Sequence, residues 1–136
     1  MKVAVYRLAH FNAAHRLYRK DWTEEQNKSI FGLCANANYH GHNYTIEVKV
    51  VGEIDPETGY VIDLKLLNDT VSEHILEQFD HKNLNLDVPK FADIIPTGEN
   101  IVWVIYEMLR EVLDEKYELT IKLWETPRNY FEYPVR

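Results

Sequence analysis

The sequence predicts a single α+β domain that spans residues 1–136. Residues 44–50 and 119–125 alternate apolar and polar side chains, which is the period of a strand with one buried face. Residues 2–8 and 130–133 are two further strand candidates. Two amphipathic helices fit between the second and third strands, so the order is two strands, two helices and two strands.

Both helices are predicted from apolar residues that recur at helical spacing. The first helix begins at Asp63, and the second begins at Thr97, whose hydroxyl group is placed to cap it, with Glu99 in its first turn. Residues 52–59 have the composition of a turn. The apolar positions are Leu64, Leu67, Val71 and Ile75 in the first helix and Ile101, Ile105, Met108, Leu109 and Val112 in the second.

Two helices can cover only one face of a four-stranded sheet. The opposite face and the two edge strands then need another solution, because unpaired strand edges invite association. Oligomerisation is one possibility and a polar, solvated face is the other, and the pattern alone does not separate them.

The charge balance argues against nucleic acid as the main partner. The chain carries 22 acidic and 15 basic residues, a net charge of −7, whereas phosphate binding requires clustered Lys and Arg. No apolar run reaches the roughly 18 residues of a membrane span, and none suggests a signal peptide. The single cysteine, Cys34, fits a reducing compartment, so we expect a cytoplasmic protein without disulfides.

His40 and His42, separated by one glycine, are the strongest local feature. In an extended chain such residues point to the same side, so both imidazoles can reach one ion. His15 would join them if the first two strands form a hairpin. Three histidines leave the fourth position of a tetrahedral zinc open, which is typical of catalytic sites. Such pairs alone are more often surface or core histidines, and we expect His10 and His74 to be structural.

Four other side chains are candidates for chemistry. Cys34 lies in an Asn-rich loop, where it could be a thiolate base or an inert packed thiol. Asp80 and His81 follow the first helix and could draw a proton from a thiol, or could be a solvent-facing pair. Glu125 continues the buried side of the third strand, where a carboxylate needs a partner such as a ligand with N–H donors, unless the strand end frays.

Seven segments, in chain order, resemble the 6-pyruvoyl-tetrahydropterin synthase family. The motifs are highly specific and together cover nearly the whole chain. They are FNAAHRL at 11–17, FGLCANANYHGHNY at 31–44, GEIDPETG at 52–59, DHKNLNLDVP at 80–89, FAD at 91–93, TGEN at 97–100 and WET at 124–126.

The resemblance implies a tunnelling fold, in which a four-stranded antiparallel sheet carries two helices on one face. Three subunits would close a β-barrel and two trimers would stack into a homohexamer, with active sites at subunit interfaces. The implied substrate is 7,8-dihydroneopterin triphosphate, from which a zinc-dependent lyase forms 6-pyruvoyl-tetrahydropterin. The implied roles are zinc binding for His15, His40 and His42, proton abstraction for Cys34, activation of the thiol for Asp80 and His81 of a neighbouring subunit, and pterin binding for Glu125, Thr97 and Glu99.

The sequence departs from the family pattern at two positions. Gly98 stands where the animal enzymes typically have a second threonine, and Tyr39 replaces a small residue before the histidine pair. The alternatives are a 6-carboxytetrahydropterin synthase of the queuosine pathway and a non-catalytic oligomer that binds zinc or pterin. The spacer between Cys34 and His40 is longer than in the queuosine-pathway enzymes, which favours the pyruvoyl product.

Overall fold

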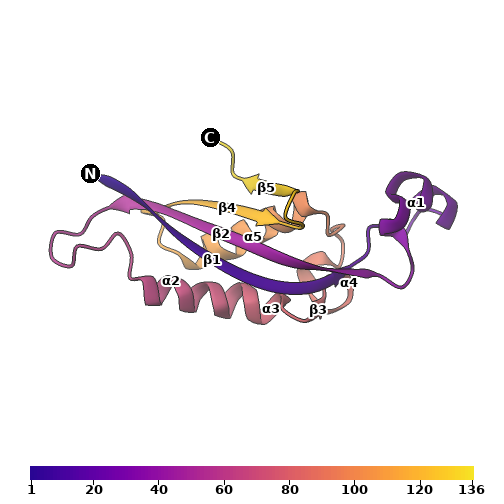
Figure 1. Ribbon diagram of the computed structural model, residues 1–136, viewed down its shortest axis with the longest axis horizontal. Helices are drawn as coiled ribbons and strands as arrows, with labels where there is room; N and C mark the ends of the chain where they lie inside the picture. Colours follow the sequence, from indigo (N-terminus) through magenta and orange to yellow (C-terminus); the bar gives the residue numbers. More distant parts are fainter.

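The protein is built on one five-stranded sheet, which confirms the α+β class. A computed structural model covers residues 1–136. The strands lie in the order β3-β1-β2-β4-β5 (Figure 1), and β1, β2, β4 and β5 are each antiparallel to their neighbours among these four. The strands are β1 Lys2–His15, β2 His40–Glu53, β3 Lys82–Asn83, β4 Glu118–Trp124 and β5 Tyr130–Tyr133.

The predicted four-stranded antiparallel sheet is wrong in one respect, because β3 adds a short fifth strand that runs parallel to β1. The segment is tied to the edge of β1 by two hydrogen bonds. The His81 amide donates to the Asn12 carbonyl at 2.7 Å, and the Asn12 amide donates to the Asp80 carboxylate at 2.9 Å. A strand of two residues has no periodicity, so the sequence pattern could not reveal it.

The first two strands are longer than predicted. β1 and β2 each have 14 residues and pair along their whole length. Where the apolar alternation stops, the strands continue because the antiparallel partner still satisfies the backbone groups. This extension places His15 opposite His40, and Ala13 opposite His42.

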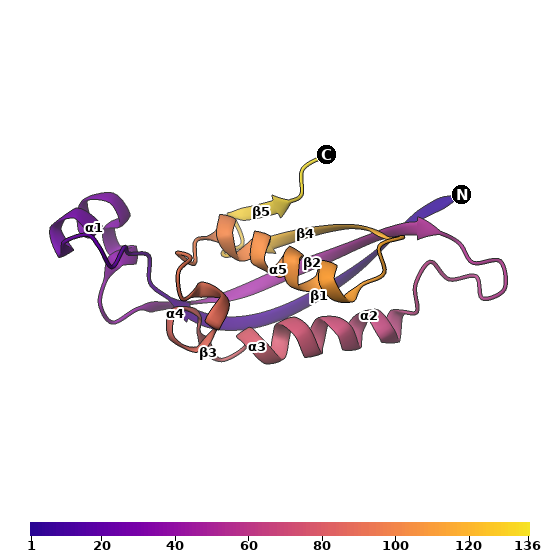
Figure 2. The ribbon, with the colours of Figure 1, turned by 180° about the vertical axis from the view of Figure 1, so that it is seen from behind.

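Two helical segments cover the same face of the sheet (Figure 2). The first joins α2 Leu64–Val71, a π-helical turn η2 Ser72–Leu76 and α3 Glu77–Phe79, and the second is α5 Gly98–Val112, so both predicted helices are confirmed. Asp63 and Thr97 are their N-caps, as predicted for Thr97. The core between helices and sheet includes the fully buried Ile46, Val48, Val50, Leu67, Ile75, Ile101, Ile105, Leu109, Leu119, Ile121 and Leu123.

Four short helical segments were not predicted from the sequence: the α-helix α1 Glu24–Phe31 and the shorter segments η1 Gly32–Ala35, α4 Leu84–Asp87 and η3 Pro89–Phe91. α1 lies at one end of the molecule, away from the sheet centre (Figure 1). A capping box defines its start, since the Thr23 hydroxyl accepts from the Gln26 amide and the Gln26 side chain accepts from the Thr23 amide. Its only buried residue is Asn27, so apolar periodicity could not indicate this helix.

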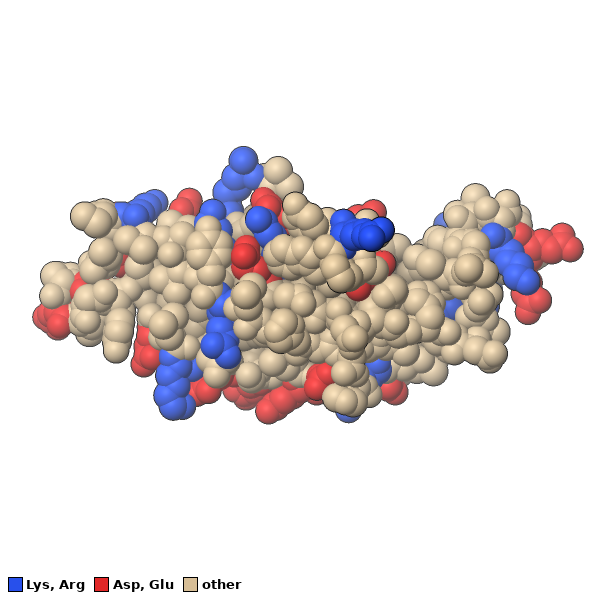
Figure 3. All heavy atoms as spheres, in the orientation of Figure 1, with Lys and Arg blue, Asp and Glu red and all other residues tan.

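The face of the sheet opposite the helices is open in the single chain. Figure 3 shows both signs of charge scattered among uncharged groups over this side of the molecule. Among its outward-facing side chains, Glu47, Lys49, Lys122 and Glu132 line a small cavity of about 190 Å³. The exposed Tyr6 and Leu8 of β1 pair in register with Lys49 and Glu47 on the same face, so the outer face mixes charged and apolar side chains. On its outer side, β1 pairs only at Ala13 and Ala14, so most of that edge has no strand partner.

None of the helices combines the length and the apolar character needed to span a membrane.

Candidate metal and catalytic site

Three histidine side chains meet where β1 ends and β2 begins. The ring centroids are 4.5 Å apart for His15 and His40, and 5.0 Å apart for His15 and His42 and for His40 and His42. One nitrogen atom of each ring lies within 4.8 Å of the others. Small side-chain movements would bring all three nitrogens to the bond length of about 2.0–2.1 Å that zinc prefers.

One nitrogen of His15 is free to bind a metal ion. The side chain is buried, and its Nδ1 donates to the carbonyl oxygen of Pro96 at 2.8 Å, which assigns the proton to Nδ1. Nε2 is then an acceptor, and it is buried without any hydrogen-bond partner. Such an orphaned atom is costly unless something binds it. A metal ion is a suitable partner for this nitrogen, and the Pro96 carbonyl is the kind of outer partner that orients metal-binding histidines.

The protonation state also suits a ligand cluster. Burial lowers the pKa of His15 to about 4, with smaller contributions from His40 and His42 and against the opposing effect of the Pro96 hydrogen bond. Burial, and then the neighbouring His42, also lower the pKa of His40. Metals bind neutral imidazole, so protons compete weakly for these two residues at neutral pH. His40 and His42 are only half-buried, which leaves the cluster approachable from one side.

A buried tyrosine beside the histidines was missed by the sequence reasoning. The hydroxyl oxygen of Tyr44 lies 3.4 Å from Nδ1 of His15. Burial raises the pKa of Tyr44 well above its ordinary value, and the nearby Glu125 and Cys34 raise it further. The tyrosine therefore stays neutral. Its position in the same alternating series as His40 and His42 was the signal that could have revealed it.

Cys34 is a half-buried free thiol, and it lies in the helical turn η1 rather than in an irregular loop. The chain just after His15 holds this turn in place. The Leu17 amide donates to the Cys34 carbonyl at 2.8 Å, and Nε of Arg16 donates to the Ala35 carbonyl at 2.8 Å. These two bonds tie the turn that carries Cys34 to the segment that directly follows His15.

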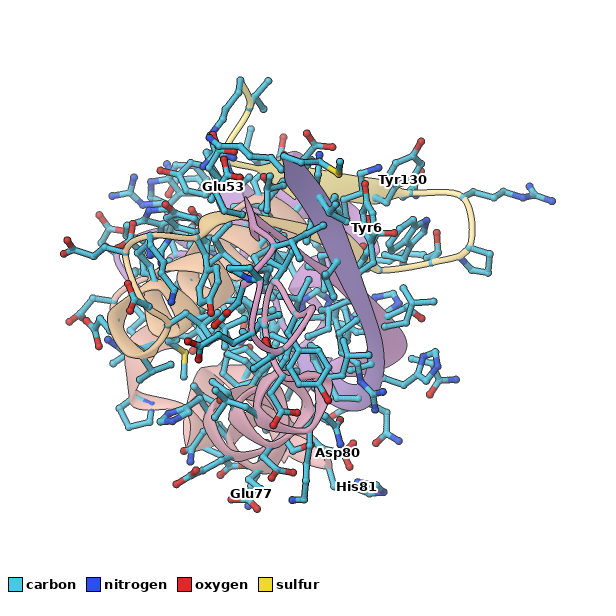
Figure 4. The ribbon with its side chains drawn as sticks, turned by 90° about the vertical axis from the view of Figure 1, so that its left-hand side faces the viewer. Tyr6, Glu53, Glu77, Asp80, His81 and Tyr130 are labelled. Atoms are coloured by element: carbon cyan, nitrogen blue, oxygen red, sulfur yellow. The ribbon has the colours of Figure 1, made fainter.

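Asp80 and His81 form a hydrogen-bonded pair at the surface, with His81 Nδ1 3.0 Å from the Asp80 carboxylate. Figure 4 shows both at the outside of the molecule. The Asn12 amide, and then His81, lower the pKa of Asp80. His81 has a φ of 60°, an unusual backbone conformation that clusters at functional sites. Besides these bonds and the bond from the His81 amide to Asn12, the Asp80 amide donates to the Leu76 carbonyl at 2.8 Å, and neither residue bonds to Cys34 of the same chain.

The predicted pterin-binding residues lie on two separate segments. Glu125 is half-buried just beyond β4, and its amide donates to the Asn129 carbonyl at 3.1 Å, so a closed turn rather than a frayed end follows the strand. The Thr97 hydroxyl accepts from the Asn100 amide at 3.2 Å, and its own hydrogen remains available to a ligand. Glu99 is exposed in the first turn of α5.

The sheet with its helices on one face and the open cluster of three histidines define an α+β protein that could hold a metal ion. The chain belongs to the 6-pyruvoyl tetrahydropterin synthase family, because the model of that family matches residues 4–135.

Known proteins support this assignment in sequence and in structure. The chain is 45% identical over 129 residues to the 6-pyruvoyl tetrahydrobiopterin synthase of Homo sapiens, with 95% of this chain and 89% of the human protein covered. The structure of the Caenorhabditis elegans 6-pyruvoyl tetrahydropterin synthase superposes with a TM-score of 0.93 at 38% identity, and covers 100% of this chain and 97% of that one. A dihydroneopterin monophosphate aldolase of Pyrococcus furiosus is 35% identical over 92% of this chain and 91% of its own length.

Proposed function

We propose that this protein is a zinc-dependent lyase that converts 7,8-dihydroneopterin triphosphate to 6-pyruvoyl-tetrahydropterin and inorganic triphosphate. The observation that carries the proposal is the cluster of His15, His40 and His42 with its unpartnered nitrogen, in a chain of this family. The 45% identity to the human 6-pyruvoyl tetrahydrobiopterin synthase supports the same product.

The chain's own residues divide the chemistry between them. A zinc ion held by the three histidines would acidify a side-chain hydroxyl of the substrate and stabilise the charge that develops there. The thiolate of Cys34 takes the proton from the adjacent carbon, and Asp80 with His81 accepts the proton of the thiol. The reaction moves reducing equivalents from the side chain to the ring, so it needs no nucleotide cofactor, and the sequence contains no G-x-G-x-x-G motif.

The carboxylate of Glu125 anchors the pterin ring. Adjacent N–H groups of the ring can donate two parallel hydrogen bonds to one carboxylate, which fixes the orientation of the ring. Thr97 and Glu99, at the start of α5, supply further contacts. The capped position of the Thr97 hydroxyl supports this role, because its hydrogen is still free to donate.

We also propose a homohexamer made of two trimers, with active sites shared between subunits. The edges of the sheet support this assembly, since β1 lacks a strand partner along most of its outer side. The surface position of Asp80 and His81 supports it as well. In the single chain they do not bond to Cys34, so a neighbouring subunit is the natural source of the pair that serves each thiol.

A second candidate function is cleavage of a carbon–carbon bond in the substrate side chain. The observation that favours it is the 35% identity to an archaeal dihydroneopterin monophosphate aldolase. The 6-carboxytetrahydropterin synthases also cleave a carbon–carbon bond of the side chain, and they release a two-carbon fragment. All of these reactions can begin with removal of a proton from the substrate's side chain while that side chain is bound to the metal. The histidine cluster therefore does not distinguish between the candidate reactions.

Product analysis separates the candidates. Purified zinc-loaded protein is incubated with 7,8-dihydroneopterin triphosphate, and in parallel with the monophosphate, and the products are identified by mass spectrometry. We expect 6-pyruvoyl-tetrahydropterin and triphosphate from the first substrate. Stoichiometric acetaldehyde with 6-carboxytetrahydropterin would replace this function by the queuosine-pathway reaction, and a shortened pterin from the monophosphate would replace it by the aldolase reaction. No consumption of either compound would leave only a binding role.

A further inference from the structure

The ring of Phe131 in β5 packs directly against the backbone of Gly98, the first residue of α5. A methyl group built on Gly98 would lie 2.1, 2.3 and 2.6 Å from three ring atoms of Phe131. These distances are far shorter than van der Waals contact, so no larger residue fits at position 98 while the ring keeps its place. Packing against Phe131 therefore requires a glycine at position 98.

The start of α5 is also the segment behind the metal cluster. The carbonyl oxygen of Pro96 accepts the hydrogen bond from Nδ1 of His15 at 2.8 Å. Thr97, the next residue, caps the helix through the Asn100 amide. A displacement of this turn would thus move a candidate pterin ligand and the partner of a metal ligand together.

The other side of the contact belongs to the hairpin that carries Glu125. The Glu125 amide is bonded to the Asn129 carbonyl at 3.1 Å, which closes the turn between β4 and β5. Phe131 follows in β5 and pairs in register with Leu123 of β4. Because Leu123 faces the core, Phe131 points to the same side, toward α5. The ring thus bridges the hairpin and the first turn of the helix.

We propose that Phe131 is a positioning residue for the pterin pocket. Its ring, seated on Gly98, sets the separation between the start of α5, with Thr97, and the turn that holds Glu125. This inference rests on the proposed function, since it uses the pterin-binding roles of Thr97 and Glu125. The contact between Gly98 and Phe131 joins the two segments by apolar packing.

Five variants test the proposal, one of which is Gly98→Thr alone, the partner single variant of the double variant described below. Gly98→Ala inserts a methyl group into the ring position. Phe131→Val removes all three of the overlapping ring atoms, introduces no clash and keeps a β-branched residue suited to a strand. The double variant Gly98→Thr/Phe131→Val fills the vacated space from the helix side. Gly52→Ala is the matched control, because its methyl group would meet Tyr117 and Val61 at 3.1 Å. Gly52 is near the opposite end of β2 from the histidines.

The expected result is a change in substrate binding that stability alone does not produce. A shift of the two segments by about 1 Å can cost up to roughly a hundredfold in catalytic efficiency, so we expect KM to rise about tenfold in Gly98→Ala and in Phe131→Val. The double variant should recover a KM closer to wild type than either Gly98→Thr or Phe131→Val alone. Gly52→Ala should leave KM unchanged, whatever its effect on Tm.

Hydrogen exchange measured by mass spectrometry provides a readout that does not depend on activity. In Phe131→Val, the amides of residues 98–101 should exchange faster than in wild type, while those of the β1–β2 hairpin should not. Unchanged exchange there, or a KM that stays at the wild-type value in both Gly98→Ala and Phe131→Val, would overturn the proposal. A wild-type protein that does not consume the substrate would refute the proposed function instead, and the exchange experiment would still decide whether the ring fixes the turn.

Discussion

At the scale of single residues, the histidine cluster illustrates how a hydrogen bond can reserve a ligand atom. Pro96 takes the Nδ1 proton of His15 and leaves Nε2 buried without a partner. His40 and His42 are less buried than His15, and they lie on β2, the strand that pairs with the β1 strand of His15. The ligand that completes this cluster is therefore expected to approach from the side of β2.

Replacing His40 by Ala should remove the metal. We expect about one zinc ion per chain in the wild-type protein, and at least about tenfold weaker binding in His40→Ala, because two imidazoles hold zinc far less well than three. Folding should survive, since His40 is half-buried and outside the hydrophobic core. Metal analysis by plasma mass spectrometry measures the loss, and His10→Ala, an exposed histidine of β1, is the control. Full zinc occupancy in His40→Ala would exclude it as a ligand.

The buried His15 predicts a pH dependence of stability in the metal-free protein. Its pKa is about 4 in the folded state, against 6.5 for an unperturbed histidine. Between these values the unfolded chain binds a proton that the folded chain does not, so the free energy of unfolding should fall as the pH drops from about 6.5 to about 4. The shift corresponds to a loss on the order of 3 kcal/mol.

Urea unfolding of the metal-free protein at several pH values measures this slope. His15→Gln should flatten it, whereas His10→Gln, at an exposed position, should not. Equal slopes in wild type and His15→Gln would show that other groups control acid unfolding.

At the scale of elements, the sequence predicted those strands and helices whose apolar residues recur with a regular period. Alternation located the first half of β1 and the central parts of β2 and β4, and helical spacing located the segments from Asp63 and from Thr97. It could not reveal the two-residue β3 or the capped helix α1, because neither buries an apolar face of its own. The three histidines were predictable because parity and a hairpin bring them together. The Pro96 carbonyl, 81 residues from His15 in the chain, carries no local signal.

Tyr39 marks the turn between η1 and β2, and it adopts a φ of 65°. This left-handed conformation costs an L-residue about 1–2 kcal/mol, a cost that glycine does not carry. Tyr39→Gly should therefore be more stable than Tyr39→Ala by about 1 kcal/mol, although both lack the ring. Chemical unfolding of the two variants measures the difference. A glycine variant no more stable than the alanine variant would mean that the turn relaxes to another conformation when the ring is lost.

At the scale of the whole molecule, the candidate site is divided by the architecture. The three histidines and Tyr44 gather at the end of the β1–β2 hairpin, where the turn of Cys34 is bonded to Leu17, whereas Asp80 and His81 lie at the outer edge of β1. That edge offers unpaired backbone groups to a neighbouring chain, and closure of sheets into a barrel would pair them. The same association would carry the Asp80 and His81 pair of one chain toward the thiol of the next.

Shared sites predict complementation between two inactive variants. Cys34→Ala lacks the proposed base and His81→Ala lacks its proposed activator, so each homooligomer should be inactive or nearly so. In mixed oligomers with equal and random composition, about one quarter of the sites should combine an intact thiol from one chain with an intact His81 from its neighbour. Co-expression with two different affinity tags, followed by sequential purification, isolates the mixed species, and its turnover per chain should approach that fraction of the wild-type value. Cys34→Ala combined with the double variant Cys34→Ala/His81→Ala is the control and should give no activity. Native mass spectrometry verifies that the oligomers are mixed. If they remain as inactive as the parents, the thiol and its activator lie in the same chain. A fully active monomer in light scattering would rule out the shared site altogether.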